Sequence, residues 1–140
     1  MWTTTYTATT DLPPAAVWAA LRALHSGYTP SADSDRFELH GPFAVGTRIS
    51  LTPAGQETVE SVITAVQDEQ LYEDRTELGD IALVFRFVLT PDGAGTRVEH
   101  TLQIEGPAAD ATGPVIGPQI SADFPDSTAE LFAAAAAGVR

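Results

Sequence analysis

Between residues 36 and 105 the pattern is that of successive strands, and in several stretches hydrophobic and polar residues alternate, as is typical of β-strands that bury one face. Short stretches rich in glycine, proline and aspartate divide this segment into strand-like runs. The runs are 36–40, 47–52, 58–66, 71–78, 81–90 and 96–106. Because the connections between them are too short for a crossover helix, we predict antiparallel hairpins. Residues 3–10, rich in threonine, fit a further strand near the start of the chain.

Residues 11–27 change to the period of a helix. One face of this segment carries three apolar residues spaced four and then three positions apart, Val17, Leu21 and Leu24. Asp11 stands before two prolines and is the predicted N-cap, since its carboxylate can accept from free N–H groups of the first turn. Gly27 is predicted to end the helix.

Helical periodicity returns after Gly106. Pro114 and Pro118 are compatible with a first turn, whereas Pro125 falls within the predicted helix and should bend it because proline has no N–H to donate. The apolar side of this helix is marked by Ile116, Ile120, Phe124, Thr128 or Leu131, and Ala135. The order of elements predicts an α+β domain, in which a curved antiparallel sheet packs its apolar face on a long C-terminal helix. We expect such a curved sheet to leave a pocket inside.

Composition limits the number of domains and the classes of function that the sequence allows. The chain has 140 residues and a mass of 14.8 kDa, which fits one domain over residues 1–140. Its net charge of −12 would repel nucleic acid and anionic membrane surfaces, so we expect neither as a partner. Without cysteine or lysine, thiolate and Schiff-base chemistry are excluded. The first residues lack a signal-peptide pattern, so we expect a cytoplasmic protein.

The last predicted hairpin separates an inner from an outer face of the sheet. If Thr90 lies opposite Arg97, one face carries the pairs Leu89 with Val98, Phe87 with His100, and Phe85 with Leu102, followed by Ile104. The other face carries Arg97, Glu99 and Gln103, which are charged or polar. The first set is therefore predicted to face the interior.

The preceding strands extend this inner face. A two-residue turn at 79–80 would add Tyr72, Asp74 and Thr76, although a one-residue slip would exchange Asp74 for its neighbours. The strand before it is predicted to turn Val59, Ser61, Ile63 and Ala65 inward. For the strand at 47–52 we favour an inward Ile49 and Leu51, and its register stays open.

Three polar side chains on the predicted inner face are candidates for acid–base chemistry. His100 can exchange a proton near neutral pH, or it is an interior histidine bonded to a neighbour. Asp74 could orient His100 or act as a base with a raised pKa, or its carboxylate reaches water at a strand end. Tyr72 offers a hydroxyl group to a ligand, or it only forms the cavity wall. His25 and His40 are predicted to be cap or surface residues, and the three scattered histidines indicate no metal site.

The sequence resembles a known family in three places. These are the segment GPFAVGTRISLTPAG, the strand pair that ends in PDGAGTRVEHTLQIEGP, and a closing helix with a proline in its middle. In this order, over about residues 3–137, they resemble the polyketide cyclase/dehydrase branch of the START-like (SRPBCC, Bet v 1-like) superfamily. The resemblance implies a helix-grip fold, a curved seven-stranded sheet around a long C-terminal helix with an internal hydrophobic cavity. The family often carries tryptophan and histidine where this chain has Tyr28 and Phe87.

The combined expectation is a pocket for a hydrophobic, polyketide-like small molecule. An enzyme would fold the substrate there and move protons with His100 together with Asp74 or Tyr72 as candidate catalytic residues, without a cofactor or metal. The predicted ligand-binding residues are Tyr28, Ile63, Thr76, Phe85, Phe87, Leu102, Ile116, Ile120 and Phe124. The alternatives are a non-catalytic carrier or sensor with the same pocket, and a protein-interaction module. We expect a monomer or homodimer.

Overall fold

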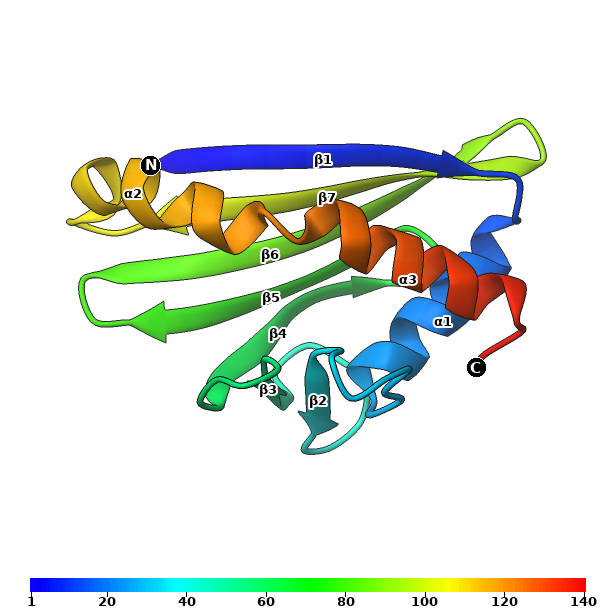
Figure 1. Cartoon of the computed structure of the whole chain (residues 1–140), viewed down its shortest axis with the longest axis horizontal. Helices are drawn as coiled ribbons and strands as arrows, with labels where there is room; N and C mark the ends of the chain where they lie inside the picture. Colours follow the sequence, from blue (N-terminus) through cyan, green and yellow to red (C-terminus); the bar gives the residue numbers. More distant parts are fainter.

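The computed structural model describes residues 1–140 and contains seven strands and three helices (Figure 1). The strands are β1 (Trp2–Thr10), β2 (Arg36–Leu39), β3 (Arg48–Thr52), β4 (Val59–Gln67), β5 (Leu71–Leu78), β6 (Ile81–Asp92) and β7 (Gly95–Glu105). The helices are α1 (Pro14–His25), α2 (Ala109–Ser121) and α3 (Phe124–Ala136). All strands form one antiparallel sheet in the order β1-β7-β6-β5-β4-β3-β2, and α3 lies across it. The predicted helix-grip architecture is confirmed.

The registers of the two long hairpins agree with the prediction. In β6 and β7, Phe87 pairs with His100 and Phe85 pairs with Leu102. In β5 and β6 the turn at 79–80 pairs Leu78 with Ile81. The predicted inner face is buried, since Tyr72 is 0% exposed, Asp74 6% and Thr76 2%. Ile49 of β3 is also buried, which settles the register that the sequence left open.

A β-bulge in β4 corrects one predicted position. Ile63 pairs with Asp74, but the next pair is Ala65 with Glu73, so the register shifts between residues 63 and 65. Ser61 and Ile63 face inward as predicted. Ala65, predicted to be inward, lies opposite Glu73 on the outer face. Val66 takes the inward place and packs on the core. The extra residue of a bulge reverses the alternation beyond it.

Helix α1 begins differently from the prediction and ends as predicted. Its N-cap is Pro13 and not Asp11, and the cap makes no side-chain hydrogen bond. Proline at the first positions of a helix has no N–H group, so fewer free N–H groups at this end need a hydrogen bond from a capping side chain. At the other end, Gly27 has φ +120° and the Tyr28 N–H donates to the carbonyl of Ala23. This is the geometry of a helix closed by a left-handed residue.

The predicted long C-terminal helix is divided in two. Helix α2 ends at Ser121 and α3 begins at Phe124, so the break lies directly before Pro125, which cannot donate a backbone hydrogen bond. The predicted disturbance at Pro125 is therefore present as an interruption. The placement of Pro114 and Pro118 in a first turn was wrong, since both lie inside α2. Each removes one N–H donor from α2.

Helix α2 approaches β1 closely because it carries glycine at two contact points. A Cβ atom at Gly113 would lie 2.4 Å from Trp2 Cβ, and a Cβ atom at Gly117 would lie 2.3 Å from Trp2 Cζ3. Both glycines are buried. The indole therefore occupies the space that side chains at these positions would fill. No helix of the protein is both long and apolar enough to cross a membrane.

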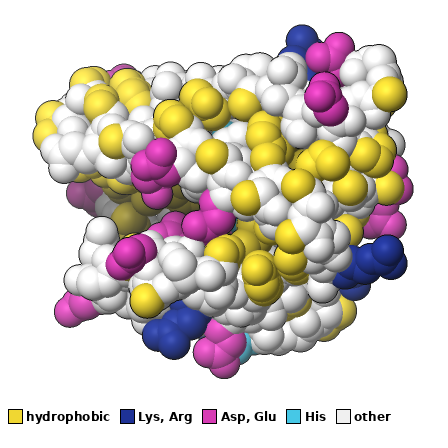
Figure 2. Space-filling view, turned by 45° about the vertical axis from the view of Figure 1, so that its right-hand side comes forward, with side chains coloured by type: hydrophobic (Ala, Val, Ile, Leu, Met, Phe, Trp, Pro, Cys, Tyr) yellow, Lys and Arg dark blue, Asp and Glu magenta, His cyan; other side chains and the backbone are white.

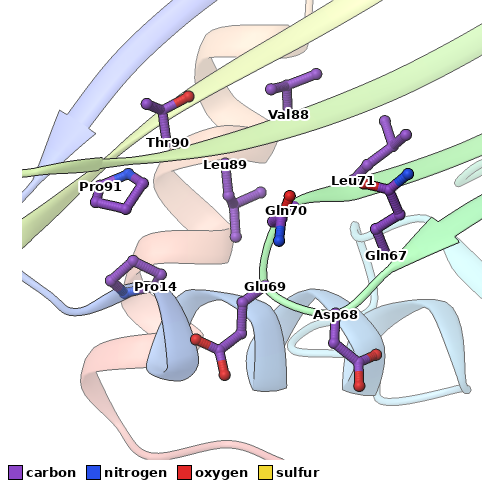
Figure 3. A pocket seen from close by; sticks show the side chains of 10 residues that line it. All are labelled: Pro14, Gln67, Asp68, Glu69, Gln70, Leu71, Val88, Leu89, Thr90 and Pro91. Atoms are coloured by element: carbon purple, nitrogen blue, oxygen red, sulfur yellow. The ribbon is translucent and has the colours of Figure 1, made fainter.

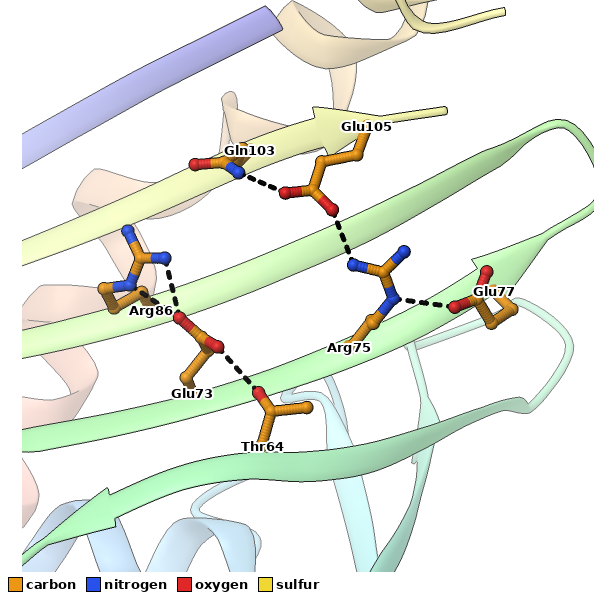
Figure 4. A network of polar contacts seen from close by, with 7 residues as sticks. All are labelled: Thr64, Glu73, Arg75, Glu77, Arg86, Gln103 and Glu105. Carbon is orange, nitrogen blue, oxygen red and sulfur yellow. Dashed lines mark hydrogen bonds and ion pairs between the residues drawn. The ribbon is translucent and has the colours of Figure 1, made fainter. Parts of the chain in front are cut away.

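The outer face of the sheet carries a network of charged side chains (Figure 4). Arg86 contacts Glu73 at 2.7 Å, and Glu73 also accepts a hydrogen bond from Thr64. Arg75 bridges two strands, with Nη1 2.6 Å from Glu105 Oε2. Such half-exposed pairs contribute little stability individually, but they mark this face as the solvent side. The chemistry of the interior must therefore come from the opposite face.

Candidate functional site

Two polar residues of β5 form a buried pair on the inner face. Tyr72 and Asp74 are two positions apart in a strand, so both side chains point to the same side. The Tyr72 hydroxyl donates a hydrogen bond of 2.7 Å to Asp74 Oδ2. One position further along this face, Thr76 shares a hydrogen bond with Ser61 of β4. The structure thus brings together two of the three predicted catalytic residues.

The environment of Asp74 changes its acidity. Burial raises the pKa of Asp74 to about 6, because the ionised form loses solvation, and the nearby Glu73 acts in the same direction. The hydrogen bond from Tyr72 opposes this shift by stabilising the carboxylate. Burial and the Asp74 charge also raise the pKa of Tyr72, so its hydroxyl remains a donor. A carboxyl group with this pKa can take up and release a proton near neutral pH.

His100 lies on the neighbouring part of the inner face and is held between two phenylalanine rings. Its ring centroid is 3.9 Å from that of Phe87 and 3.7 Å from that of Phe124, with both pairs stacked. Burial lowers the pKa of His100 to about 3, so the ring is neutral at pH 7. Its Nδ1 atom is buried and has no hydrogen-bond partner. His100 is thus suited to hydrogen bonding and poorly suited to act as a base.

His25 is buried beside Tyr72, contrary to the prediction from its place at a helix end. It was predicted to be a cap or surface residue, but it is 6% exposed and its ring lies 4.3 Å from the Tyr72 ring. Burial lowers the pKa of His25 to about 4. The signal was present, because residue 25 continues the buried stripe of Val17 and Leu21 at a spacing of four. His40 is exposed, as predicted, and contacts Ser50.

The predicted ligand-binding residues differ in how far they are buried. Ile63 and Leu102 are fully buried, Phe124 and Thr76 nearly so, and Tyr28 is 41% exposed in the loop after α1. The four that keep part of their surface exposed are Phe85, Phe87, Ile116 and Ile120. Figure 2 shows the molecule hollowed between an upper and a lower lobe on the left of the view. Phe85, Ile116 and Ile120 pack against one hydrophobic core cluster and still keep part of their surface uncovered.

Two surface pockets lie away from these residues. One, of about 650 Å³, is formed by the start of α1, the β4–β5 turn and the end of β6, and Asp68 and Glu69 lie at its edge (Figure 3). The other, of about 500 Å³, lies over β2 and β3 and includes His40, Ser50 and Glu60. Neither contains a predicted site residue. No group of three or more His, Asp or Glu side chains is arranged to hold a metal ion.

Thr128 adds a second buried polar atom without a partner. It lies on α3, one turn after Phe124, and is 2% exposed. Its Oγ1 atom makes no hydrogen bond, and only Nδ1 of His100 shares that condition among buried side chains. Buried polar atoms are seldom left unpaired in proteins. Two buried polar atoms, one on β7 and one on α3, are thus left without a protein partner.

Acid is expected to destabilise the protein because of its two buried histidines. Their pKa values, about 4 for His25 and about 3 for His100, lie below the ordinary value of 6.5 that the unfolded chain regains. The unfolded chain therefore binds more protons below pH 6.5, and stability falls with pH. Asp74 acts in the opposite sense, because its pKa of about 6 exceeds the unfolded value of 3.8. Together these groups should lower the free energy of unfolding by about 3 kcal/mol between pH 7 and pH 4.5.

Urea denaturation at both pH values measures this difference. His100→Phe keeps a stacked ring and removes one titrating group, so its free energy of unfolding should depend less on pH, by about 2 kcal/mol. Equal stability of the unchanged protein at pH 7 and pH 4.5 would contradict the assignment of neutral interior histidines.

Comparison with known proteins adds a family and a fold. A family model described as polyketide cyclase / dehydrase and lipid transport matches residues 1–136. No curated protein matches the chain significantly in sequence. Among solved structures, Ara h 8.0201 is 15% identical with a TM-score of 0.66, covering 94% of this chain and 97% of that one. Norcoclaurine synthase from Thalictrum flavum is 15% identical with a TM-score of 0.68, covering 93% and 85%.

A second structure of the Thalictrum flavum enzyme holds dopamine and hydroxybenzaldehyde. It is 14% identical to this chain, with a TM-score of 0.63, and the match covers 93% of this chain and 85% of that one. At these identities the likeness shows a shared Bet v 1-like fold, while the match to the family model assigns the family.

Proposed function

Because the chain belongs to the polyketide cyclase / dehydrase and lipid transport family, we propose that it binds a hydrophobic small molecule between the sheet and its helices and catalyses a cyclisation or dehydration of that molecule. The ligand would be a polyketide-like or aromatic compound, in keeping with the partly exposed apolar side chains Phe85, Phe87, Ile116 and Ile120. The proposal keeps the expectation of a cytoplasmic monomer or homodimer.

The observation that carries the enzyme proposal is the Tyr72–Asp74 pair. The pair is buried on the inner face, its hydrogen bond is 2.7 Å long, and the pKa of Asp74 is raised to about 6. A general base works best when its pKa lies near the working pH, because it is then mostly ionised and still binds the proton in transit. Strongly shifted carboxyl groups in a hollow are typical of functional sites.

In the proposed reaction, the Asp74 carboxylate removes a proton from a carbon between two carbonyl groups of a poly-β-ketone. The enolate carbon attacks another carbonyl carbon of the same molecule, which forms a carbon–carbon bond, and the new alkoxide takes the proton from Asp74. Loss of that hydroxyl group with a neighbouring proton releases water and leaves a double bond. Tyr72 holds the carboxylate in place, and the apolar walls exclude water from the reactive intermediate.

Carriage of the same ligand without reaction is the second candidate. It is favoured by His100, whose pKa of about 3 keeps the ring neutral and limits it to hydrogen bonding. In a carrier, Asp74 and Tyr72 would only orient the ligand. Turnover by the unchanged protein separates the two functions, since both require binding in the hollow.

Ligand binding is tested with a neutral fluorescent probe, N-phenylnaphthylamine, whose emission increases in apolar surroundings. We expect saturable binding, and Ile116→Glu should weaken it at least tenfold because the variant places a charge at the wall of the hollow. Val115→Glu is the matched control, since Val115 is 62% exposed on the same helix. The proposal is wrong if the probe does not bind, or if both substitutions weaken binding equally.

A further inference from the structure

A hydrogen bond to the backbone determines which nitrogen of the His25 ring carries the proton. Nδ1 of His25 lies 2.8 Å from the carbonyl oxygen of Leu21, one turn earlier in α1. A carbonyl oxygen only accepts hydrogen bonds, so Nδ1 must carry the proton. The ring is neutral at pH 7, because burial lowers its pKa to about 4. The second nitrogen, Nε2, therefore carries a lone pair and is a hydrogen-bond acceptor.

Burial determines which nitrogen of the neutral His100 ring is expected to carry the proton. Its Nδ1 atom is buried without a partner. An N–H group at that position would lose its hydrogen bond to water and gain none, and orphaned buried N–H groups are rarer than orphaned acceptors. Nε2 also makes no hydrogen bond with the protein, but unlike Nδ1 it is not fully buried. The neutral ring is thus expected to carry its proton on Nε2, as a donor.

The two histidines lie beside the same aromatic side chain. The Phe87 ring is 5.8 Å from the His25 ring and 3.9 Å from the His100 ring, measured between centroids. The Tyr72 ring, 4.3 Å from His25, joins this group to Asp74. Nε2 of His25 also has no partner and is not among the buried partnerless atoms. One part of the interior therefore presents one fixed donor and one fixed acceptor, both unused.

We propose that His100 donates through Nε2–H to a carbonyl oxygen of the ligand, and that His25 accepts through Nε2 from a ligand hydroxyl group. The ligand class is then an aromatic compound that carries both a carbonyl and a hydroxyl group on separate parts of its skeleton. This inference rests on the proposed ligand site. It also fits the proposed reaction, because cyclisation and dehydration of a poly-β-ketone leave phenolic hydroxyl groups beside remaining carbonyl groups.

Four naphthalenes test the assignment, since they differ only in these two groups. The probes are naphthalene, naphthol, acetonaphthone, and a hydroxyacetonaphthone with its two substituents on different rings. The unchanged protein should bind the last about five- to tenfold more tightly than either singly substituted compound, which is the usual contribution of one hydrogen bond. Titration calorimetry or the intrinsic fluorescence of the probes gives the dissociation constants.

Two variants assign each group to its histidine. His100→Phe keeps the stacked ring but has no N–H, so it should lose only the gain from the acetyl group. His25→Phe should lose only the gain from the hydroxyl group. If naphthalene and its derivatives bind the unchanged protein equally, or if each variant affects the wrong group, the inference is overturned while ligand binding stands. If none of the four binds, the proposed function itself fails, and the inference fails with it.

The nitrogen resonances of the two rings give a test that needs neither a ligand nor a variant. In uniformly ¹⁵N-labelled protein at pH 7, His25 should show a protonated Nδ1 and a bare Nε2, and His100 should show the reverse. The same protonated nitrogen on both rings would overturn the donor–acceptor pair, whether or not the variants fold.

Discussion

Replacing Asp74 by asparagine is expected to lower kcat/KM for cyclisation of a poly-β-ketone by about 100-fold or more, which is the usual contribution of general acid–base catalysis. The amide has nearly the shape of the carboxyl group and can still accept the hydrogen bond from Tyr72. It cannot take a proton from carbon. Affinity for a neutral aromatic probe should remain within about threefold, since the apolar walls are unchanged.

The dependence of the rate on pH strengthens this test. The ionised carboxylate is the active form, so kcat/KM of the unchanged protein should rise with pH through the pKa of Asp74, about 6, and level off above it. Asp80→Asn is the matched control, because Asp80 is exposed in the β5–β6 turn. Asp74→Asn with the rate of the unchanged protein would remove this residue from the mechanism and leave a carrier.

The Gly117→Ala variant is expected to lower the free energy of unfolding by about 2 kcal/mol, the effect of overpacking a core. The new methyl group would lie 2.3 to 2.6 Å from three atoms of the Trp2 ring, and one of the two elements must move. Alanine is otherwise favoured over glycine within a helix by about 1 kcal/mol. A loss of stability would therefore come from the contact with Trp2 and not from helix propensity.

The Trp2→Ala background supplies the control for this prediction. With the indole removed, the space beside Gly117 is open, and the same substitution should stabilise the protein slightly through its helix propensity. Urea denaturation of the four proteins in the cycle gives the coupling free energy. If Gly117→Ala changes the free energy of unfolding equally in both backgrounds, contact with Trp2 is not what makes glycine necessary at this position.

The sheet was predictable because its sequence has a period of two and its turns are short. Once the turn at 79–80 is placed, the inward direction of Asp74 and His100 follows without further information. The bulge in β4 could not be predicted in this way. Apolar residues stand in adjacent pairs on both sides of Thr64, Val62 with Ile63 and Ala65 with Val66, so the sequence does not show which member of each pair faces inward. The extra residue is visible only in the pairing with β5. Ala65 was therefore assigned to the wrong face.

The inner-face positions of the candidate residues were predictable, but their acidities were not. Alternation placed Tyr72, Asp74 and His100 on one face, whereas their acidities depend on burial and on contacts between distant segments. Phe124 stacks on His100 from a helix 24 positions further along the chain, and no local pattern indicates that contact. His25 was missed for a different reason, because a histidine at a helix end is ordinarily a surface residue.

The stacking partner of His100 stands at the first residue of α3, directly after the interruption between the two C-terminal helices. Phe87 belongs to β6 and Phe124 to α3, so the two rings that cover the imidazole come from different elements. Any shift of the start of α3 relative to the sheet would therefore uncover one face of the His100 ring.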